Sequence, residues 1–481
     1  MLRPQFAAIG TVAALLCANA LLAQSSMAPL AGFGANGWLA PNAIPQLDTS
    51  NSQRGMALNT VTGNLVLVDR DATLGNNAWV IDGTTGAVIG ALTPPATGYT
   101  GGTFVVNVPG VADDGSIYVC NLVTSTASTF KVYKWDSEAA GLTTPGTEVL
   151  VSPGSGGAWG GLNRAGDCFA VQGGGASPVQ FAASGSNSAA GTNSAFLQGV
   201  LDGNNVVKGY VSVPGTPTAS NGYRLGITFV DQDTIIGTQG ATAYVTSFDG
   251  TNATVDSTIA TGAAQRGLDY AVIGGVPVLA IIDTNSSVVS IYDLSFPGSP
   301  LLLTSGTTTS GTLSANANGT SCVAWGPASG NSATLYAMSS NQGIQAFTVT
   351  IQQPARATSF GVGCGTPALS LGASAAPVLG NVFNLDAGNV PSTDLLVGFA
   401  IGFTAIPGGV ALPIAPGCSQ YVVPDAAIVA LNGGTGTVSA AQSFPADPAF
   451  AGIELFGQAV SLNGSGAVLT SNGLKLFLQL F

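Results

Sequence analysis

Histidine is missing from this 481-residue sequence, and charged side chains make up only 7% of it, against about 25% in an average soluble domain. Without histidine the chain can build neither a Ser-His-Asp nor a Cys-His arrangement. It also lacks the commonest general base and the usual nitrogen ligand of zinc. The scarcity of Glu–Lys pairs argues against a protein made of charged, amphipathic helices.

Basic residues are especially scarce, because 11 Lys and Arg stand against 23 Asp and Glu and give a net charge of −12. No basic stripe is present to neutralise phosphates, so nucleic acids and anionic membranes are disfavoured as partners. The sequence contains neither a Gly-x-Ser-x-Gly elbow nor a Gly-Lys-Ser/Thr phosphate loop. We therefore name no catalytic, cofactor-binding or metal-binding residue, and an enzyme is the less favoured interpretation.

Residues 1–23 have the features of a secretory signal peptide. Arg3 gives a positive start, Ala7–Leu16 is apolar, and small residues follow. Cleavage is expected after Ala20 or after Ala23. No later segment is long and apolar enough for a transmembrane helix. We expect an exported protein, secreted or held in the cell envelope, that is not an integral membrane protein.

Export permits disulfides, and five cysteines lie beyond residue 23. Cys364 and Cys418 occupy similar glycine-containing contexts, G-V-G-C-G and P-G-C-S, in the last part of the chain, and we predict that they form a disulfide. Cys120, Cys168 and Cys322 lie in strand-like runs and are expected to act as small buried apolar side chains. A bridge between Cys120 and Cys168 remains the alternative.

A repeated unit is the main positive feature of the chain. The stretch R-G-M-A-L begins at Arg54 and is followed 28 residues later by Asp82. The stretch R-G-L-D-Y begins at Arg266 and is followed 27 residues later by Asp293. Apolar runs of strand type, broken by Gly, Asn, Ser and Asp, fill both spans. Such spacing is typical of four-stranded β-propeller blades.

The predicted fold class is all-β. A β-propeller of about six to seven blades is expected over residues 30–352, a linker over 353–358 and an antiparallel β-sandwich over 359–481. Gly37–Leu47 is expected to close the ring, and the small-residue stretch Gly173–Ala195 to form a long surface loop or a degraded blade edge. The blades are expected to begin near Arg54, Val111, Trp159, Gly226, Arg266 and Ser314.

Aspartates cluster beside several predicted strands. Asp-Asp-Gly at 113–115 suits a hairpin turn, because glycine supplies the positive φ that tight turns demand. The alternative is a calcium or acid/base site, which requires several carboxylates to converge. Both interpretations apply to the set Asp69, Asp71, Asp113, Asp114, Asp231 and Asp233.

Aromatic and arginine side chains also have a structural and a functional interpretation. Tryptophan can stack on sugars, but blade packing needs large aromatics too, so we expect the core for most of Trp38, Trp79, Trp135, Trp159 and Trp325. Arg54, Arg224 and Arg266 lie near blade starts and could line the central channel, although hydrogen bonds to backbone carbonyls are the favoured role. Gly32–Gly37 matches G-x-G-x-x-G without a flanking strand and helix, and is expected to be a flexible leader.

The segments R-G-M-A-L-N, V-A-D-D-G-S-I-Y-V-C-N-L and F-K-V-Y-K-W-D resemble a family of exported bacterial propellers of unknown function and, more distantly, lactonase-like surface propellers. The C-terminal module is similar to a domain appended to large secreted bacterial proteins. Lactonase-type propellers hold a divalent metal with Glu, Asn and Asp side chains. This chain has only three glutamates, and none aligns with such a role: Glu138, Glu148 and Glu454.

The favoured function is that of an exported, non-enzymatic binding or surface-structural protein that presents a propeller to a protein or glycan ligand. The low charge and the missing catalytic residues favour it. The alternative is a metal-assisted hydrolase or lyase that acts on carbohydrate or lactone in the propeller channel, which rests on an analogy of fold. That alternative requires Asp113, Asp114, Asp231 and Asp233 to meet at one channel mouth.

Overall fold

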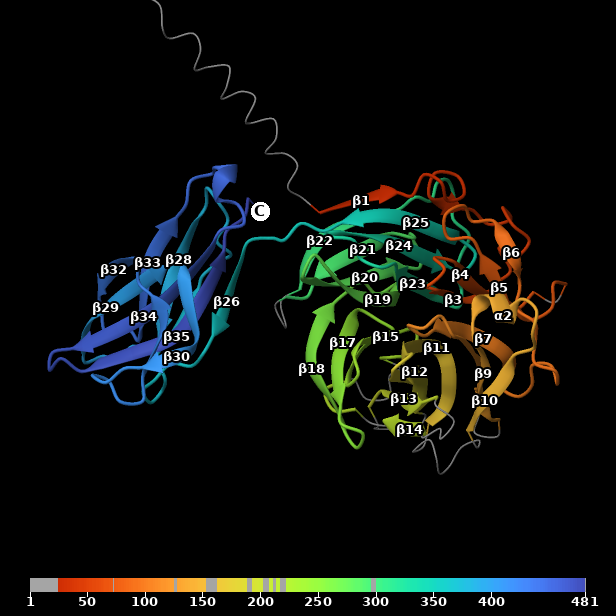
Figure 1. The fold of residues 1–481 in the computed structure, drawn as a ribbon, viewed down its shortest axis with the longest axis horizontal. Helices are drawn as coiled ribbons and strands as arrows, with labels where there is room; N and C mark the ends of the chain where they lie inside the picture. The colour runs from red at the N-terminus through yellow and green to blue at the C-terminus, as the bar shows by residue number, and fades with distance from the viewer. Residues whose placement is uncertain are drawn as a thin grey trace, which may run out of the picture. The chain divides into compact units, whose positions relative to one another are not determined.

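The chain is built almost entirely of antiparallel β-strands (Figure 1), as the all-β prediction states. The computed structural model describes residues 25–480 except for 72, 125–127, 153–161, 188–192, 202–206, 211–212, 217–221 and 296–299. Within these residues, helix is confined to α2 (Glu138–Gly141) and the 3-10 turn η1 (Pro448–Phe450). No helix of this part of the chain has the length and apolar character needed to cross a membrane.

Two compact units divide the described chain, Ser25–Ile351 and Gln352–Phe481. The first unit contains six antiparallel sheets, which we number as blades 1 to 6. Each has four strands in order from the innermost outward, and the sheet of blade 6 has β2 (Trp38–Leu39) as a fifth. Blade 1 is β3 (Gln53–Leu58), β4 (Leu65–Asp69), β5 (Asn77–Ile81) and β6 (Val88–Ala91); blade 2 is β7 (Phe104–Val111), β8 (Ile117–Leu122), β9 (Phe130–Trp135) and β10 (Thr147–Ser152). Blade 3 is β11 (Leu162–Gly174), β12 (Ser177–Asn187), β13 (Ala195–Val200) and β14 (Val207–Tyr210).

The remaining three blades follow the same order. Blade 4 is β15 (Gly226–Asp231), β16 (Thr234–Thr238), β17 (Thr242–Phe248) and β18 (Ala253–Ala260). Blade 5 is β19 (Gln265–Ile273), β20 (Val276–Asp283), β21 (Val289–Asp293) and β22 (Leu301–Gly306). Blade 6 is β23 (Ser321–Trp325), β24 (Ser332–Ser339), β25 (Gly343–Thr350) and the N-terminal strand β1 (Ser26–Pro29).

The blades form a closed ring. Each innermost strand contacts the innermost strand of the next blade, from β3 through β7, β11, β15, β19 and β23 and back to β3. Figure 1 shows the blades arranged around a central axis. This cyclic arrangement of radial four-stranded sheets is a six-bladed β-propeller.

Apolar side chains between neighbouring blades hold the ring together. Six buried clusters are present in the described residues of this unit, and each combines residues from two adjacent blades. Between blades 1 and 2, for example, Val66 and Val80 pack against Val119 and Tyr133, all of which are fully buried. The apolar faces of a propeller sheet are therefore covered by the next sheet rather than by helices.

The ring closes through the N-terminal strand. In β1, Ser26 lies opposite Thr350 of β25 and Pro29 opposite Phe347. The closing segment was predicted at Gly37–Leu47, of which only β2 (Trp38–Leu39) pairs with β25. The prediction missed β1 because its four residues, S-M-A-P, have no strand-like apolar pattern.

The glycine-rich stretch Gly32–Gly37 is an ordered turn between β1 and β2, and not the flexible leader that we expected. The side chain of Phe33 is completely buried beside Tyr336, and the N–H of Gly34 donates to the carbonyl of Thr85. The dinucleotide-like spacing thus serves packing between the first and last blades.

Some predicted blade boundaries differ from those of the structure. Val111 ends β7 rather than beginning a blade, and the sixth blade begins at Ser321, after the predicted Ser314. Gly173–Ala195 contains β12, where Phe181 is fully buried, so the expected surface loop is largely strand. Trp159 lies outside the described residues.

The Arg-to-Asp repeat occupies equivalent places in blades 1 and 5. Arg54 and Arg266 are each the second residue of an innermost strand. Asp82 directly follows β5, and Asp293 ends β21, the third strand in each blade. Both carboxylates accept nearby backbone N–H groups, from Thr84 and Thr85 in one blade and from Ser295 in the other. The repeat therefore marks equivalent positions in two blades, namely the start of the innermost strand and the end of the third strand.

The second unit is a two-layer arrangement of strands. One sheet has the order β26 (Arg356–Phe360), β35 (Val468–Phe477), β34 (Glu454–Asn463), β29 (Asp394–Gly402) and β32 (Ala426–Leu431). The other has the order β27 (Ser370–Ala373), β28 (Val382–Gly388) and β33 (Thr437–Ser443), and a two-stranded ribbon pairs β30 (Thr404–Ala411) with β31 (Ser419–Val423). Because β26 starts at Arg356, it enters the segment predicted as a linker.

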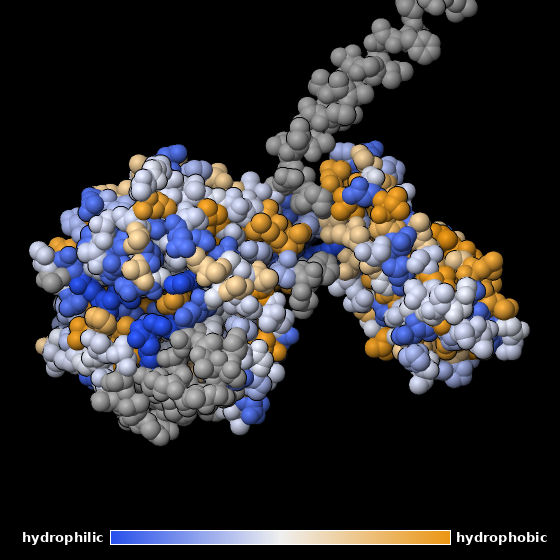
Figure 2. All heavy atoms as spheres, turned by 180° about the vertical axis from the view of Figure 1, so that it is seen from behind, coloured by the Kyte–Doolittle hydropathy of each residue, from blue (hydrophilic) through white to orange (hydrophobic). Residues whose placement is uncertain are grey.

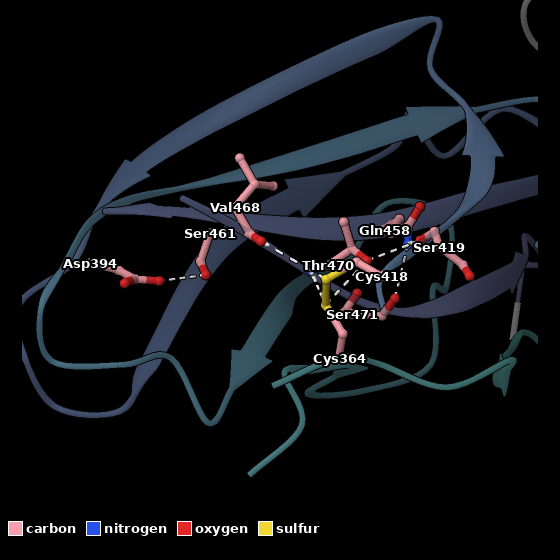
Figure 3. Close-up of a disulfide and its surroundings, with 9 residues drawn as sticks. All are labelled: Cys364, Asp394, Cys418, Ser419, Gln458, Ser461, Val468, Thr470 and Ser471. Atoms are coloured by element: carbon pink, nitrogen blue, oxygen red, sulfur yellow. Dashed lines mark hydrogen bonds between the residues drawn. A yellow bond between two sulfur atoms is a disulfide. The ribbon is translucent and has the colours of Figure 1, made fainter. Parts of the chain in front are cut away.

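The core of the second unit lies between its two sheets, with Phe383 and Leu385 from one and Phe399 and Leu474 from the other. A disulfide joins Cys364 to Cys418 (Figure 3). Beside it the N–H of Thr470 on β35 donates to the sulfur of Cys364 (3.1 Å). The crosslinked loops are therefore fixed to this strand.

Apolar side chains are also exposed on the second unit. Figure 2 shows hydrophobic residues over much of its visible surface. The edge strand β32 reads A-A-I-V-A-L, with Val429 64% and Leu431 82% exposed, and it pairs only with β29.

Candidate functional site

A cavity lies in the propeller channel, within the part of the chain that the structure describes. It has a volume of about 360 Å³ and is lined from all six blades, at positions late in the innermost strands or just after them. Its walls include Leu58, Val111, Val171, Phe229, Tyr270 and Trp325. We call this space the channel cavity. It is open at the face where the innermost strands end.

Polar groups and apolar side chains share the wall of the channel cavity. Asp269 of β19 is placed there together with Thr228 of β15. The Asp269 carboxylate accepts the Thr228 hydroxyl (2.7 Å) and the backbone N–H groups of Tyr270 (2.9 Å) and Trp325 (2.8 Å). Burial raises the pKa of Asp269 to about 6, although these hydrogen bonds oppose the rise.

Two aromatic rings border the same polar groups. The indole N–H of Trp325 donates to the backbone carbonyl of Asp269 (3.2 Å), which fixes the ring at the wall. Trp325 is only 6% exposed, so it is chiefly a core residue, as expected, with one part at the cavity. Tyr270 is more exposed and lies at the same wall.

The aspartate pairs are placed mainly at hairpin turns. Asp113 lines the channel cavity, and its carboxylate accepts the N–H of Gly173 (3.2 Å). Asp114 accepts the N–H of Ser116 within its own turn, and Asp231 accepts that of Asp233. Of the four aspartates that the hydrolase hypothesis needs, only Asp113 reaches the cavity wall.

The other candidate carboxylates lie elsewhere. Asp69 ends β4 and is fully buried, and its Oδ1 accepts the N–H of Asp71 (3.1 Å). The three glutamates form other contacts: Glu138 with Asn64, Glu148 with Lys131 and Glu454 with Lys475. Within the residues that the structure describes, no group of three His, Cys, Asp or Glu side chains could hold a metal ion.

The remaining tryptophans are distant from the channel cavity or only partly buried. Trp135 is 3% exposed and donates its indole N–H to Thr93, and half-buried Trp38 donates to the carbonyl of Gln342. Trp79 is half-buried in β5, and no described residue accepts its indole N–H.

A narrow apolar waist lies below the channel cavity. It encloses a space of only about 50 Å³ and is formed by one or more side chains from each innermost strand, including Met56, Val108, Phe169, Ile227, Leu268 and Val323. Cys168 and Cys322 also line it, as free thiols. The waist separates the channel cavity from the end of the channel where the innermost strands begin.

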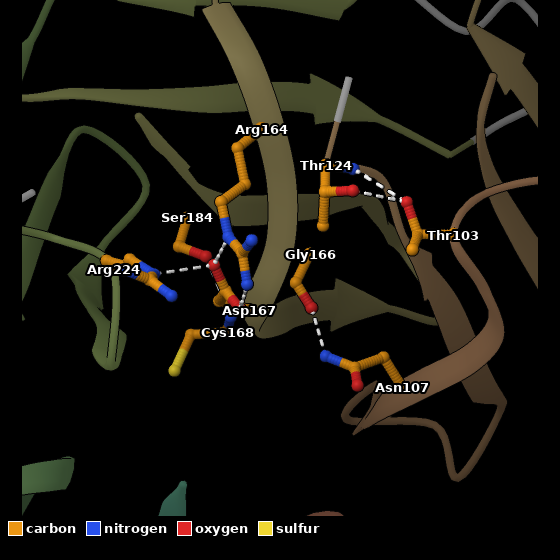
Figure 4. A network of polar contacts seen from close by, with 9 residues as sticks. All are labelled: Thr103, Asn107, Thr124, Arg164, Gly166, Asp167, Cys168, Ser184 and Arg224. Carbon is orange, nitrogen blue, oxygen red and sulfur yellow. Dashed lines mark hydrogen bonds and ion pairs between the residues drawn. The ribbon is translucent and has the colours of Figure 1, made fainter. Parts of the chain in front are cut away.

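Arginines gather at that other end of the channel. Asp167 of β11 accepts Nη2 of Arg164 (2.6 Å) through one carboxylate oxygen. Its second oxygen accepts Nε of Arg164 and Nε of Arg224, the latter at 2.9 Å. Figure 4 shows both guanidinium groups directed at this one carboxylate, which is nearly fully buried. Asn107 beside them donates to the carbonyl of Gly166.

Three further arginines belong to this group. Arg54 is only 6% exposed, and its electrostatic partners include Asp167 and Arg164 across the ring. Arg70 interacts with Arg54 and Asp167, and Arg266 interacts with Arg224. We call the set Arg54, Arg70, Arg164, Arg224 and Arg266 the arginine mouth.

The arginine mouth differs from the role that we favoured for its members. Arg54, Arg224 and Arg266 were expected to donate to backbone carbonyls. Arg224 instead donates to Asp167, and no hydrogen bond of Arg54 or Arg266 to a described residue is present. Arg70 and Arg164 were not singled out by the sequence, although Arg164 lies close to a blade start.

Comparisons with known proteins give no functional assignment. No family model matches the sequence, and no curated protein matches it. Among solved structures, a DUF4623 family protein from Bacteroides eggerthii is similar at 15% identity over 63% of this chain and 72% of its own, with a TM-score of 0.46. A gluconolactonase from Xanthomonas campestris is 12% identical over 69% and 92% of the two chains (TM-score 0.35), and the allergen Mala s 1 of Malassezia sympodialis is 13% identical over 63% and 92% (TM-score 0.31).

Proposed function

We propose that this chain is an exported, non-enzymatic binding protein whose propeller holds a ligand in the channel cavity. The observation that carries the proposal is the cavity of about 360 Å³, in which polar groups and aromatic rings line the same wall. A cavity of that size lies in the range of small-molecule sites. Export is expected from residues 1–23, which resemble a signal peptide.

The lining favours a neutral or weakly polar ligand such as a sugar unit or a short peptide segment. The rings of Tyr270 and Trp325 offer apolar surface for stacking, while Gln172 and Asp113 offer hydrogen-bonding groups at the rim. Six interblade cores make the wall rigid, so little conformational freedom is lost when a ligand enters.

The second unit supports a role at a surface. Its edge strand β32 exposes Val429 and Leu431, and it carries no charged side chain. An apolar edge of this kind is suited to contact with another macromolecule. We propose that this unit is the accessory or attachment module of the binding protein.

The test is a titration of the exported protein with a panel of neutral oligosaccharides and unlabelled peptides, followed by calorimetry and tryptophan fluorescence. A cavity ligand should bind wild type and lose at least about tenfold in affinity for Trp325→Ala, which removes ring surface. Trp79→Ala, which changes a half-buried tryptophan outside the cavity, should leave the affinity unchanged. The proposal would be contradicted if both variants lost affinity equally, or if neither variant lost affinity.

The alternative is hydrolysis or elimination on a carbohydrate or lactone, with catalysis by cavity carboxylates. One observation favours it: Asp269, whose pKa is raised to about 6, and Asp113 line the same cavity. Turnover of a glycan or lactone by wild type that is lost in Asp113→Asn, with the fold intact, would establish this alternative over the binding role.

A further inference from the structure

We propose that the arginine mouth is an anion site, which binds a carboxylate, sulfate or phosphate group through the free guanidinium donors of Arg54 and Arg266. The site lies at the opposite end of the channel from the channel cavity, across the apolar waist. It is independent of the function proposed above.

The distribution of charge is the first support. The propeller sequence from residue 25 to 351 contains five arginines, and all five belong to the arginine mouth. The rest of this unit is strongly acidic, yet Asp167 is the one carboxylate that forms ion pairs with these described arginines. Asp283 faces Arg266 at longer range, so the mouth keeps an excess of positive charge.

Arg54 is the second support. It is 6% exposed, and its Nε and Nη1 have no hydrogen-bond partner in the described structure. Burial lowers its pKa, and the positive charge of Arg164 lowers it further, while Asp167 opposes the shift. A buried cation whose donors lack hydrogen-bond partners is costly, and an anion between Arg54 and its neighbours would reduce that cost.

Two neighbouring arginines add unused donors. Nε of Arg266 is buried without a partner, and its guanidinium packs against the backbone of Gly319. The guanidinium of Arg70 lies over the ring of Phe104, 3.8 Å from its centroid, and its Nη1 is also unpartnered. Burial and the charge of Arg54 lower the pKa of Arg70 to about 9.

The mouth is already ordered around these free donors. Asp167 holds Arg164 and Arg224 in fixed positions, and the N–H of Cys168 next to it is tied to the hydroxyl of Ser184 (Figure 4). Two of the five guanidinium groups are therefore fixed before a ligand arrives, which lowers the conformational entropy lost on binding. The waist at Met56 and Leu268 separates the site from the channel cavity.

Guanidinium forks match the planar or tetrahedral oxygens of carboxylate, sulfate and phosphate. The group can belong to a free inorganic anion or to the acidic end of a larger molecule, such as a uronic acid or a sulfated sugar. Both sources offer the same oxygens to Arg54. The larger source also needs room outside the mouth, so the two are separated by experiment.

The experiment is calorimetric titration of the full exported chain at constant ionic strength in chloride. Its arms are sodium sulfate, sodium phosphate, glucuronate and a sulfated monosaccharide, with neutral glucose as the reference. Saturable binding of at least one anion by wild type is expected, with no binding of glucose at this site. Inorganic anions binding as tightly as the sugar acids would identify a free anion as the ligand. Tighter binding of a sugar acid would identify a larger one.

The key variant is Arg54→Met, which keeps an unbranched apolar chain and removes the charge. Its affinity for the anion should fall at least about tenfold, the loss typical of a charged hydrogen bond. In the absence of anion, the melting temperature of Arg54→Met should equal or exceed that of wild type. The substitution removes a buried charge whose donors lack hydrogen-bond partners. Lys134→Met is the matched control. It also removes one positive charge, but Lys134 pairs with the exposed Asp136 and is not part of the arginine mouth.

The proposal is overturned if wild type binds none of the four anions. It is also overturned if Arg54→Met binds them as tightly as wild type and the control Lys134→Met do. If Arg54→Met does not fold, Arg266→Met decides in its place, because Arg266 is only half-buried, and unchanged affinity there overturns the proposal. If a ligand binds in the channel cavity and none of the anions binds, the anion site is contradicted and the proposed function is not.

Discussion

The carboxylate of Asp269 on β19 accepts the backbone N–H of Trp325 on β23 at a distance of 2.8 Å. This bond joins the innermost strands of blades 5 and 6, while the hydroxyl of Thr228 brings in β15 of blade 4. One side chain thus ties three neighbouring blades together at the wall of the channel cavity. The same carboxylate is therefore both a candidate ligand group and a structural link.

Asp269→Ala should destabilise the propeller. The change leaves the N–H groups of Trp325 and Tyr270 and the hydroxyl of Thr228 without their acceptor. Buried donors left unpaired cost about 1–3 kcal/mol each, so for three donors we expect a loss of about 3 kcal/mol or more in the free energy of unfolding by guanidinium. Thr228→Val, which removes a single hydroxyl, should cost much less. A loss of equal size in both variants would contradict the linking role.

Asp69→Asn should change the pH dependence of stability. Burial raises the pKa of Asp69 to about 6 from its ordinary value of 3.8, so the folded state holds a proton that the unfolded state has lost. Wild type therefore loses stability as the pH rises from about 4 to about 6 and gains none of it back above that.

The variant cannot titrate at this position, so its stability relative to wild type should rise across the same window by on the order of 2–3 kcal/mol. Asp269 titrates in both proteins and cancels in the difference. Thermal melts at pH 4, 5, 6 and 7 measure this difference directly. A difference that stays flat over the window would show that Asp69 is charged at little cost in the folded state.

Cys364→Ser with Cys418→Ser should weaken the second unit. The disulfide closes a loop with a sequence separation of 54, and in the chain-entropy model such a crosslink contributes about 4 kcal/mol. The loss should appear in the unfolding of this unit, followed by Tyr421 fluorescence or hydrogen exchange on β35. Protection of the propeller strands β20 and β24 serves as the internal control and should not change.

The thiols of Cys120 and Cys168 should be inert in the folded protein. Burial raises the pKa of Cys120 from 9.0 to about 12, which lowers its thiolate fraction by about a thousandfold, and it raises that of Cys168 as well. A disulfide-exchange reagent at pH 8 should therefore react rapidly with neither until the protein is denatured. Fast labelling of the native protein would indicate that the waist of the channel opens.

Much of the fold was accessible from the sequence because blades are local structures. The repeat at Arg54 and Arg266 located two innermost strands, and Gly226 located a third. A blade start was predicted near Val111, whereas Val111 ends β7 and the turn at 113–115 leads to the second strand of the same blade. The strand β12 was missed because its small side chains, buried by neighbouring blades, give no apolar pattern of their own.

The site was less accessible, because its residues meet only when the ring is closed. Asp269 and Trp325 lie far apart in the sequence, and nothing near either of them indicates their contact. Arginines near blade starts were given two roles, and the structure supports the less favoured one, in which they gather at the channel. Their ion pairs were missed, because Asp167 occurs in the unremarkable stretch N-R-A-G-D-C.

The pairing of β1 with β25 has a mechanical consequence. Ser26 lies opposite Thr350, so the two ends of the propeller unit emerge side by side at one seam. A force applied between these ends would break the hydrogen bonds between β1 and β25 one after another, starting at Ser26 and Thr350. It would not shear the two strands past each other. The ring should resist force through its blades and yield first where its first and last strands meet. A chain anchored through residues beyond Ile351 and pulled at its N-terminus would therefore open at this seam before any blade is lost.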